Sequence, residues 1–554
     1  MLNMKFISSL EKVFPDQKIE DFKELNTVRA LKGERVSVQL IYSYDPKVIH
    51  GGHCQRNKIE LSGALAHFAN MREVRCVPVT MPTNPYGCDE NYLRTTPGLY
   101  PDVLVPMNYG GALPYSHNTL KSVWIEIDLP EDITAGKHSL TFKVIGNDYV
   151  GTHEASFTLE VINAVLPKDD IYFTQWFHCD CLANYYGVEV WSEKHWEIVE
   201  NFTRVAAKNG INLLLTPVFT PPLDTTVGGE RRTTQLVGVT KTGDKYSFDF
   251  TLVDRWVDMC NRCGIKYFEV SHLFTQWGAK HAPKIMATVD GEYKRIFGWE
   301  TEATGKEYST FIRQFLSGFL SHMKARGDDK RCIFHISDEP SLDHLENYKA
   351  AKALIADLLD GYMIIDALSN FKFYETGALE HPIPCNNHVH EFIDKGVKDL
   401  WTYYCVSQPV DVANRYMSMP LWRTRSIGMQ MYKYNVNGFL QWGYNFYNNQ
   451  YSDTPINPYL ITDCEGSFPA GDAYSVYPAS NGEALESIRI IAHHQALNDI
   501  KAMKLCESLY SHDEVVASME DAFGKEIRFD VCAKSADEML AVREKVNEMI
   551  KAKV

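Results

Sequence analysis

From about residue 168 onward the chain alternates short apolar segments with amphipathic segments of helical length, and this alternation most restricts its fold. Within the helical segment before Gly264, the apolar residues share one face. Alternating strands and helices predict the α/β class, and eight strands predict a (β/α)8 TIM-like barrel, with other doubly wound sheets as the alternative. The candidate strands are residues 171–177, 211–216, 265–270, 332–336, 362–367, 383–387, 400–405 and 438–442.

Residues before Pro167 have a different pattern, with short segments of alternating polarity separated by turns. We expect strands at residues 35–44, 74–79, 121–129, 138–145 and 155–162, which predict an N-terminal β-sandwich. The predicted domains are therefore a sandwich over 1–167, a catalytic barrel over 168–505 and a C-terminal tail over 506–554 that packs on the barrel.

Two smaller features interrupt or extend this plan. Residues 231–240 and 245–250 alternate around Thr242-Gly243-Asp244, which predicts a hairpin at the edge of the active-site mouth. In the tail, residues 527–531 predict a strand, and the pair Ser535 and Glu538 predicts the start of a final helix.

Composition limits the partners. The 554 residues are 45% hydrophobic and carry a formal charge of -15, so we expect substantial cores and neither a nucleic-acid nor an anionic-membrane partner. The N-terminus has no apolar stretch of signal-peptide length and no segment reaches membrane-spanning length, which predicts a cytoplasmic protein without membrane insertion. Thirteen scattered cysteines fit a reducing compartment, and the oligomeric state is not predicted.

The tetrad Ser337-Asp338-Glu339-Pro340 follows the apolar segment 332–336, where a buried strand is expected to end. Two adjacent carboxylates cannot easily flank a glycosidic bond from opposite faces, as the paired acids of most glycosidases do. They suit substrate-assisted hydrolysis, in which a 2-acetamido oxygen attacks the anomeric carbon, Asp338 orients the acetamido group and Glu339 protonates the leaving oxygen. The alternative is an exposed acidic loop start without function.

The ends of the other predicted strands supply further polar and aromatic candidates, because barrel enzymes place their chemistry there. A tryptophan could form the apolar floor beneath a sugar, and a tyrosine hydroxyl could fix the acetamido oxygen; ordinary core packing is the alternative for each residue. The predicted substrate-binding residues are Trp176, His272, Trp401, Tyr403, Trp442, Tyr444 and Asn445, and further strand-end residues are Gln175, His178, Trp277, Asp366, Asn370 and Tyr404.

Fragments of metal-binding patterns occur without their second halves. Cys260 and Cys263 fall on the apolar face of a helix, so core packing is favoured over zinc. We find neither a phosphate-binding glycine loop nor a Gly-x-Ser-x-Gly motif, so hydrolysis with no cofactor and no metal is the simplest expectation.

Taken in order, these motifs resemble glycoside hydrolase family 123, the β-N-acetylgalactosaminidases, and a wider group of related bacterial proteins. The resemblance covers most of the chain. It rests on His335-Ile336-Ser337-Asp338-Glu339-Pro340, on Tyr100-Pro101-Asp102-Val103-Leu104-Val105-Pro106, on Pro221-Pro222 followed by Phe248-Asp249-Phe250, on residues 438–444, and on Gly471-Asp472 with Val476-Tyr477-Pro478 and Ser487-Ile488-Arg489.

This resemblance implies a sandwich followed by a barrel, retention of anomeric configuration and an oxazolinium intermediate. It implies that Glu339 is the general acid/base and that Asp338 stabilises the acetamido group. We expect an exo-acting enzyme that removes terminal β-GalNAc from oligosaccharides such as those of glycosphingolipids, with the proton held by Glu339 near neutral pH. One departure is Gly471-Asp472-Ala473, where relatives often have Gly-Asp-Gly.

Two alternatives remain open. The first is a hydrolase of another 2-acetamido sugar on the same framework, because one or two loop side chains decide the preference at C4. The second is a glycan-binding protein that has lost turnover.

Overall fold

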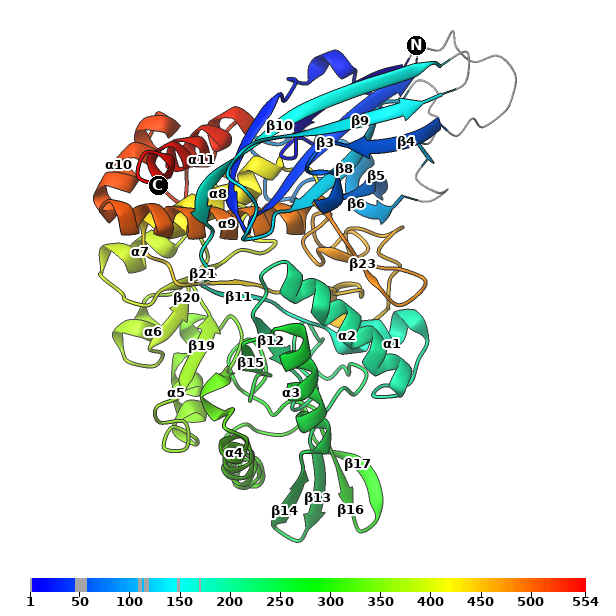
Figure 1. Ribbon diagram of the computed structural model, residues 1–554. Coiled ribbons are helices and arrows are strands. Elements are labelled where there is room, and N and C mark those ends of the chain that lie inside the picture. The colour runs from blue at the N-terminus through cyan, green and yellow to red at the C-terminus, as the bar shows by residue number, and fades with distance from the viewer. Residues whose placement is uncertain (1, 45–56, 108–111, 114–118, 147–149, 169–170) are drawn as a thin grey trace. The chain divides into compact units, whose positions relative to one another are not determined.

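The computed structural model describes residues 2–44, 57–107, 112–113, 119–146, 150–168 and 171–554. The chain forms two compact units (Figure 1). The first contains Met1–Asp170, Pro409–Lys433 and Leu485–Val554, and the second contains Ile171–Gln408 and Tyr434–Ala484. The predicted domain limits and the predicted packing of the tail stay predictions.

The first unit contains two five-stranded sheets, ordered β1-β3-β8-β5-β6 and β2-β10-β9-β4-β7. Side chains of both sheets, such as Leu40 and Leu140, share one hydrophobic cluster. The strands are β1 (Leu2–Ser8), β2 (Thr27–Lys32), β3 (Arg35–Tyr44), β4 (Asn57–Ser62), β5 (Ala69–Val79), β6 (Gly98–Pro106), β7 (Ala112–Leu113), β8 (Lys121–Asp128), β9 (Gly136–Ile145) and β10 (Thr152–Val165).

All five strands predicted in this region are found, and the sequence pattern missed the others. Strand β6 contains Pro101 and Pro106, which cannot donate to a ladder, and it lies at the edge of its sheet, where proline is tolerated. The described residues of this unit also form four α-helices, of which α8 and α9 lie side by side (Figure 1). These are α8 (Leu421–Lys433), α9 (Ile488–Leu509), α10 (His512–Phe523) and α11 (Ala536–Lys551).

The tail meets one expectation and contradicts another. Ser535 caps α11 by accepting a hydrogen bond from the Glu538 backbone N–H, as predicted. Residues 527–531 are irregular, so the predicted strand is wrong. Their backbone carbonyls instead accept hydrogen bonds from the Gln430 amide, which holds the segment against α8. Helix α11 contacts strands β2 and β10.

The second unit contains eight parallel-paired strands in two sheets, ordered β11-β22-β21 and β12-β15-β18-β19-β20. A parallel bridge between Cys385 and Tyr403 connects β20 with β21, and the Asn212 backbone N–H donates to the Phe173 carbonyl between β12 and β11. The strands are β11 (Tyr172–Gln175), β12 (Leu213–Thr216), β15 (Tyr267–Val270), β18 (Cys332–Phe334), β19 (Met363–Ala367), β20 (His381–Ile383), β21 (Trp401–Tyr403) and β22 (Gly438–Gln441).

Seven of these strands lie within the predicted segments. The sixth is displaced: β20 ends at Ile383, where the prediction began, because His388 donates its backbone N–H to the Cys385 carbonyl and turns the chain. Helices of this unit are α1 (Cys179–Tyr186), α2 (Glu193–Lys208), α3 (Thr251–Cys263), α4 (Lys306–Arg326), α5 (Leu345–Ala353), α6 (Lys372–Glu375) and α7 (Val389–Asp394).

The predicted hairpin is present as β13 (Gly238–Thr242) and β14 (Lys245–Asp249). It joins β16 (Ile285–Val289) and β17 (Glu292–Phe297) in a separate four-stranded sheet. A short pair, β23 (Val476–Pro478) and β24 (Ala484–Glu486), follows β22. Among the described helices, none combines the length and apolar character that a membrane span requires.

Candidate active site

Asp338 and Glu339 lie in the loop that follows β18, as predicted from the sequence. The Asp338 carbonyl accepts a hydrogen bond of 2.8 Å from the Trp277 backbone N–H, and the Glu339 backbone N–H donates to the Ala367 carbonyl at 3.0 Å. Glu339 has a φ of 40°, a left-handed conformation that costs energy in a residue with a side chain. Neighbouring strand ends therefore hold the two acids in a strained loop.

Both carboxyl groups face a cavity of ≈ 120 Å³. Three of the predicted substrate-binding residues line it: Trp176, Tyr403 and Trp442. The remaining lining is mostly apolar or amide, which suits a neutral ligand. The complete set is Trp176, Leu223, Asp224, Gln276, Trp277, Asp338, Glu339, Ala367, Tyr403, Cys405, Val406, Leu440, Trp442 and Phe468.

Each of the three predicted rings is fixed by an acidic side chain. The Tyr403 hydroxyl donates to Glu339 Oε1 at 2.5 Å. The Trp442 indole N–H donates to Asp472 Oδ2 at 2.9 Å, so the loop with Ala473 in place of glycine still supports the ring. The Trp176 indole N–H donates to Glu269 Oε1 at 2.7 Å.

Four predicted substrate-binding residues do not line this cavity. Trp401 is 1% exposed and stacks on Tyr172 with ring centroids 4.9 Å apart. Both residues pair with Gly438, and a Cβ atom at Gly438 would lie 2.0 Å from the indole. The missing side chain at Gly438 thus leaves space that the Trp401 ring fills inside the unit.

Tyr444, Asn445 and His272 are buried for separate reasons. Tyr444 donates its hydroxyl to the Phe202 carbonyl of α2. Asn445 pairs its amide with the backbone N–H and C=O of His178. His272 stacks on His335 with ring centroids 4.2 Å apart.

Sequence reasoning named Trp277 as a strand-end residue and missed Asp224 and Gln276. Asp224 lies in the loop after β12. Its backbone N–H donates a hydrogen bond of 2.7 Å to the Gln276 amide oxygen, which holds this loop. Asp224 Oδ2 accepts the Tyr451 backbone N–H, and the Trp277 and Tyr451 rings meet edge to face at 6.2 Å. The sequence offered no periodic signal for this rim, because its three loops lie far apart in the chain.

The pKa values of the adjacent acids are raised for different reasons. Burial and the nearby charge of Glu339 raise the pKa of Asp338 well above its usual range. Burial also raises the pKa of Glu339, but the hydrogen bond from Tyr403 opposes that rise. The sequence predicted the proton on Glu339 near neutral pH, and this stays a prediction. At the rim, burial raises the pKa of Asp224 to about 6.

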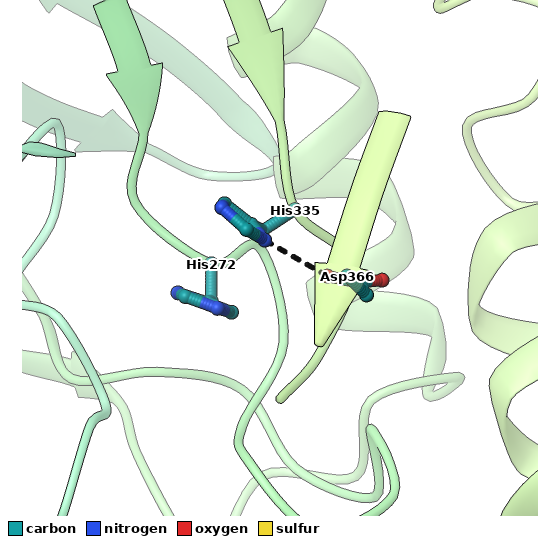
Figure 2. A group of neighbouring side chains, drawn as sticks. All are labelled: His272, His335 and Asp366. Carbon is teal, nitrogen blue, oxygen red and sulfur yellow. Dashed lines mark hydrogen bonds and ion pairs between the residues drawn. The ribbon is translucent and has the colours of Figure 1, made fainter. Parts of the chain in front are cut away.

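Three buried polar side chains, His272, His335 and Asp366, lie close together (Figure 2). His335 Nδ1 is 3.0 Å from Asp366 Oδ1, and its Nε2 is 2.8 Å from Glu269 Oε1. Among the described residues, His272, His335 and Asp366 have donor atoms close enough to share a metal ion. Each nitrogen of His335 already contacts a carboxylate. A metal ion bound to either nitrogen would replace one of these contacts, so the three residues do not fit a metal site.

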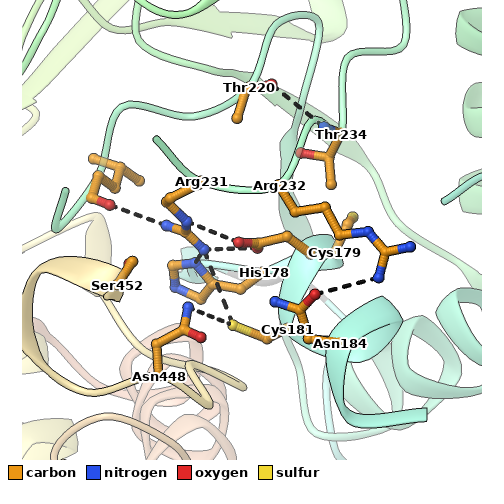
Figure 3. A network of polar contacts seen from close by, with 12 residues as sticks. His178, Cys179, Cys181, Asn184, Thr220, Arg231, Arg232, Thr234, Asn448 and Ser452 are labelled. Atoms are coloured by element: carbon orange, nitrogen blue, oxygen red, sulfur yellow. Dashed lines mark hydrogen bonds and ion pairs between the residues drawn. The ribbon is translucent and has the colours of Figure 1, made fainter. Parts of the chain in front are cut away.

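A second network supports the loop that carries Asp224 (Figure 3). The buried guanidinium of Arg231 binds both oxygens of Asp180 at 2.8 and 2.6 Å and donates to the Leu223 carbonyl at 3.0 Å. It also donates to His178 Nδ1, and burial and the Arg231 charge lower the pKa of His178 to about 3. Cys181 Sγ accepts the Tyr447 backbone N–H and the Asn448 amide N–H in this network.

The first unit contains a larger cavity of ≈ 310 Å³. Its charged lining residues are paired: Arg543 with Glu34, and Arg425 with buried Asp499. These pairs leave little charge for a ligand, so the cavity beside Asp338 and Glu339 is the candidate active site.

The chain is similar to known proteins in sequence and in fold. The family model of the glycoside hydrolase 123 catalytic domain matches residues 176–506. A solved structure of a family 123 glycoside hydrolase from Clostridium perfringens, determined to study glycolipid glycan hydrolysis, is 15% identical, with a TM-score of 0.74 over 100% of this chain and 98% of that one. A β-glucuronidase from Parabacteroides merdae is 9% identical, with a TM-score of 0.30 over 91% of this chain and 51% of that one. No curated protein sequence matches the chain.

Proposed function

Because the chain belongs to glycoside hydrolase family 123, we propose that it is a retaining exo-β-N-acetylgalactosaminidase that releases terminal β-GalNAc from glycans of the glycosphingolipid type. The observation that carries this proposal is the cavity that adjacent Asp338 and Glu339 line together with five aromatic side chains. Its size and apolar walls suit one sugar residue, and its two neighbouring acids suit a substrate that supplies its own nucleophile.

In the proposed mechanism, Asp338 accepts a hydrogen bond from the acetamido N–H and directs the acetamido oxygen to the anomeric carbon. Glu339 gives a proton to the leaving oxygen, and an oxazolinium ion forms. Water then attacks the anomeric carbon, Glu339 removes a proton from that water, and the configuration is retained. An N–H donor at Asp338 favours its anion, so substrate binding moves the shared proton toward Glu339.

The proposed architecture is a (β/α)8 barrel preceded by a β-sandwich. The bridge between Cys385 and Tyr403 and the hydrogen bond from Asn212 to Phe173 support closure of the eight strands. The cluster shared by the two five-stranded sheets supports the sandwich. A crystal structure with an open edge between β20 and β21 would contradict the barrel.

Chromogenic β-GalNAc, β-GlcNAc and β-Gal substrates test the proposed activity, with wild type and Glu339→Gln compared. We expect hydrolysis of β-GalNAc, little hydrolysis of β-Gal and a loss of about 10²- to 10⁴-fold in the variant. A dominant rate on β-GlcNAc would indicate another 2-acetamido sugar. Binding of GalNAc by calorimetry, without any product from the three substrates, would indicate a glycan-binding protein.

A further inference from the structure

His335 follows β18 and is fully buried between two carboxyl groups, which come from the strands on either side of β18. Glu269 lies on β15 and its Oε1 is 2.8 Å from His335 Nε2. Asp366 lies on β19 and its Oδ1 is 3.0 Å from His335 Nδ1, the contact that Figure 2 shows. A neutral imidazole has one N–H, so it can donate to only one of the two. An imidazolium can donate to both.

The two carboxyl groups accept hydrogen bonds from several other donors. Asp366 accepts the backbone N–H groups of Ile336 and Ser337, within 3.3 Å, and the Tyr348 hydroxyl at 2.6 Å. Because Asp338 follows Ser337 directly, these bonds fix the backbone that leads into the acid loop. Burial raises the pKa of Asp366, and these hydrogen bonds oppose that rise and favour its ionised form.

Glu269 links the same ring to the cavity. Its Oε1 accepts the Trp176 indole N–H at 2.7 Å, and its Oε2 accepts the Thr174 hydroxyl at 2.5 Å. Trp176 lines the cavity, so the ring of His335 connects a cavity wall with the acid loop through one carboxyl group on each side.

The remaining neighbours of His335 also suit a cation. His272, from the loop after β15, stacks on it at an interplanar angle of 20°, and among the described side chains its two nitrogens lack hydrogen-bond partners. Burial and the His335 charge lower the pKa of His272 well below its usual range, so it is a neutral ring beside a cation. The titratable groups facing His335 are thus Glu269, Asp366, His272 and, in the acid loop, Asp338.

We propose that His335 is an imidazolium throughout the working pH range and is a positioning residue that ties the acid loop to Trp176 while its charge stabilises the Asp338 anion. The proposal rests on the proposed function for its kinetic test. Burial lowers the pKa of His335, but hydrogen bonds and charges from Asp366 and Glu269 outweigh burial and raise it to about 9. The His335 charge lowers the pKa of Asp338, in opposition to burial.

The first test does not depend on activity. In protein with ¹⁵N-labelled histidine, we expect both ring nitrogens of His335 to give N–H signals at pH 7, assigned by their loss in His335→Gln. The exposed His67→Gln variant is the matched control. A neutral ring with one unprotonated nitrogen at pH 7 would overturn the proposal, as would displacement of these protons by added Zn²⁺.

The second test is the pH profile of kcat/KM on β-GalNAc fluoride, whose leaving group is a single atom. In His335→Gln the missing cation raises the pKa of Asp338, so the acidic limb moves to higher pH by about one unit. An unchanged limb with only a lower maximum would show a purely structural role. If wild type leaves the fluoride and the chromogenic β-GalNAc substrate intact, the proposed function fails, while the spectroscopic test of His335 still stands.

Discussion

Asp338 and Glu339 are neighbours in the chain, yet their carboxyl groups have different surroundings. Glu339 accepts a hydrogen bond from the Tyr403 hydroxyl, whereas the charges of His335 and Asp366 act on Asp338. The sequence located both acids because a buried strand ends directly before them. The sequence predicted the proton on Glu339, but its pattern does not contain Asp366 of β19 and Tyr403 of β21, which act on the two acids.

The Tyr403→Phe variant tests the difference between the two acids. Loss of the hydroxyl removes the hydrogen bond that lowers the pKa of Glu339, so that pKa rises. Glu339 then keeps its proton to higher pH, and the alkaline limb of kcat/KM should move upward by about one unit. The pH profile on a disaccharide that carries β-GalNAc, whose leaving oxygen takes its proton from Glu339, measures this shift, with Tyr374→Phe as the control. An alkaline limb at the same pH in both proteins would show that Tyr403 does not affect the pKa of Glu339.

At the level of elements, the loops after β12, β15 and β22 form a rim held by hydrogen bonds. The rim residues Asp224, Trp277 and Tyr451 all have left-handed backbones, with φ of 41°, 57° and 64°. Trp277 and Tyr451 remain 36% and 40% exposed. Such conformations persist only where surrounding bonds impose them, so the two rings are held in place beside the cavity.

We expect this rim to contact the sugar on the leaving-group side of the scissile bond. Trp277→Ala and Tyr451→Ala should each lower kcat/KM roughly three- to tenfold on a disaccharide that carries β-GalNAc on a neutral hexose. Hydrolysis of β-GalNAc fluoride should change little, because fluoride cannot reach the rim. Equal losses on both substrates would place the rings in the GalNAc site instead. Tyr293→Ala, an exposed tyrosine of β17, is the control.

Contacts between strands decide which of the predicted aromatic side chains faces the cavity. The sequence pattern does not contain these contacts. Trp401 and Trp442 both follow the predicted spacing, but Gly438 on the neighbouring strand gives Trp401 a place in the core. Strand β20 shows the same limit, because one backbone turn at His388 decided where it ends.

Gly438→Ala should therefore destabilise the protein. The added Cβ would overlap the Trp401 ring, and overpacking of this kind costs about 1–3 kcal/mol. Thermal unfolding should show a lower Tm than wild type, whereas Gly98→Ala, whose added Cβ has no neighbour within 4 Å, should not. Equal Tm values for the two variants would contradict the packing account of Trp401.

At the scale of the whole molecule, the first compact unit combines three stretches of the chain. The strand and helix alternation predicts a continuous barrel over 168–505, and these limits stay a prediction, because the alternation gives the order of elements and not the surface against which each helix packs. Helices α8 and α9 belong to the alternation in sequence but lie in the unit of the two five-stranded sheets. The family motifs around Asp102 and Arg489 meet there, 387 residues apart, in a fully buried ion pair of 2.7 and 2.8 Å.

Breaking that pair should destabilise the unit strongly. Asp102→Asn leaves the Arg489 guanidinium buried with a neutral partner, at a cost of about 3–5 kcal/mol. The double variant Asp102→Leu with Arg489→Met removes both charges and should recover part of the loss, as measured by denaturant unfolding. A single variant as stable as wild type would show that the pair contributes little.

The central claim is that the acetamido group of the substrate is the nucleophile, oriented by Asp338. The most direct measurement compares kcat/KM for β-galactosaminides that carry N-acetyl, N-fluoroacetyl, N-difluoroacetyl and N-trifluoroacetyl groups on one aglycone. Fluorine withdraws electrons from the carbonyl oxygen, so participation predicts a steep fall by orders of magnitude along the series. A flat series, with Asp338→Asn equally active throughout, would contradict the account.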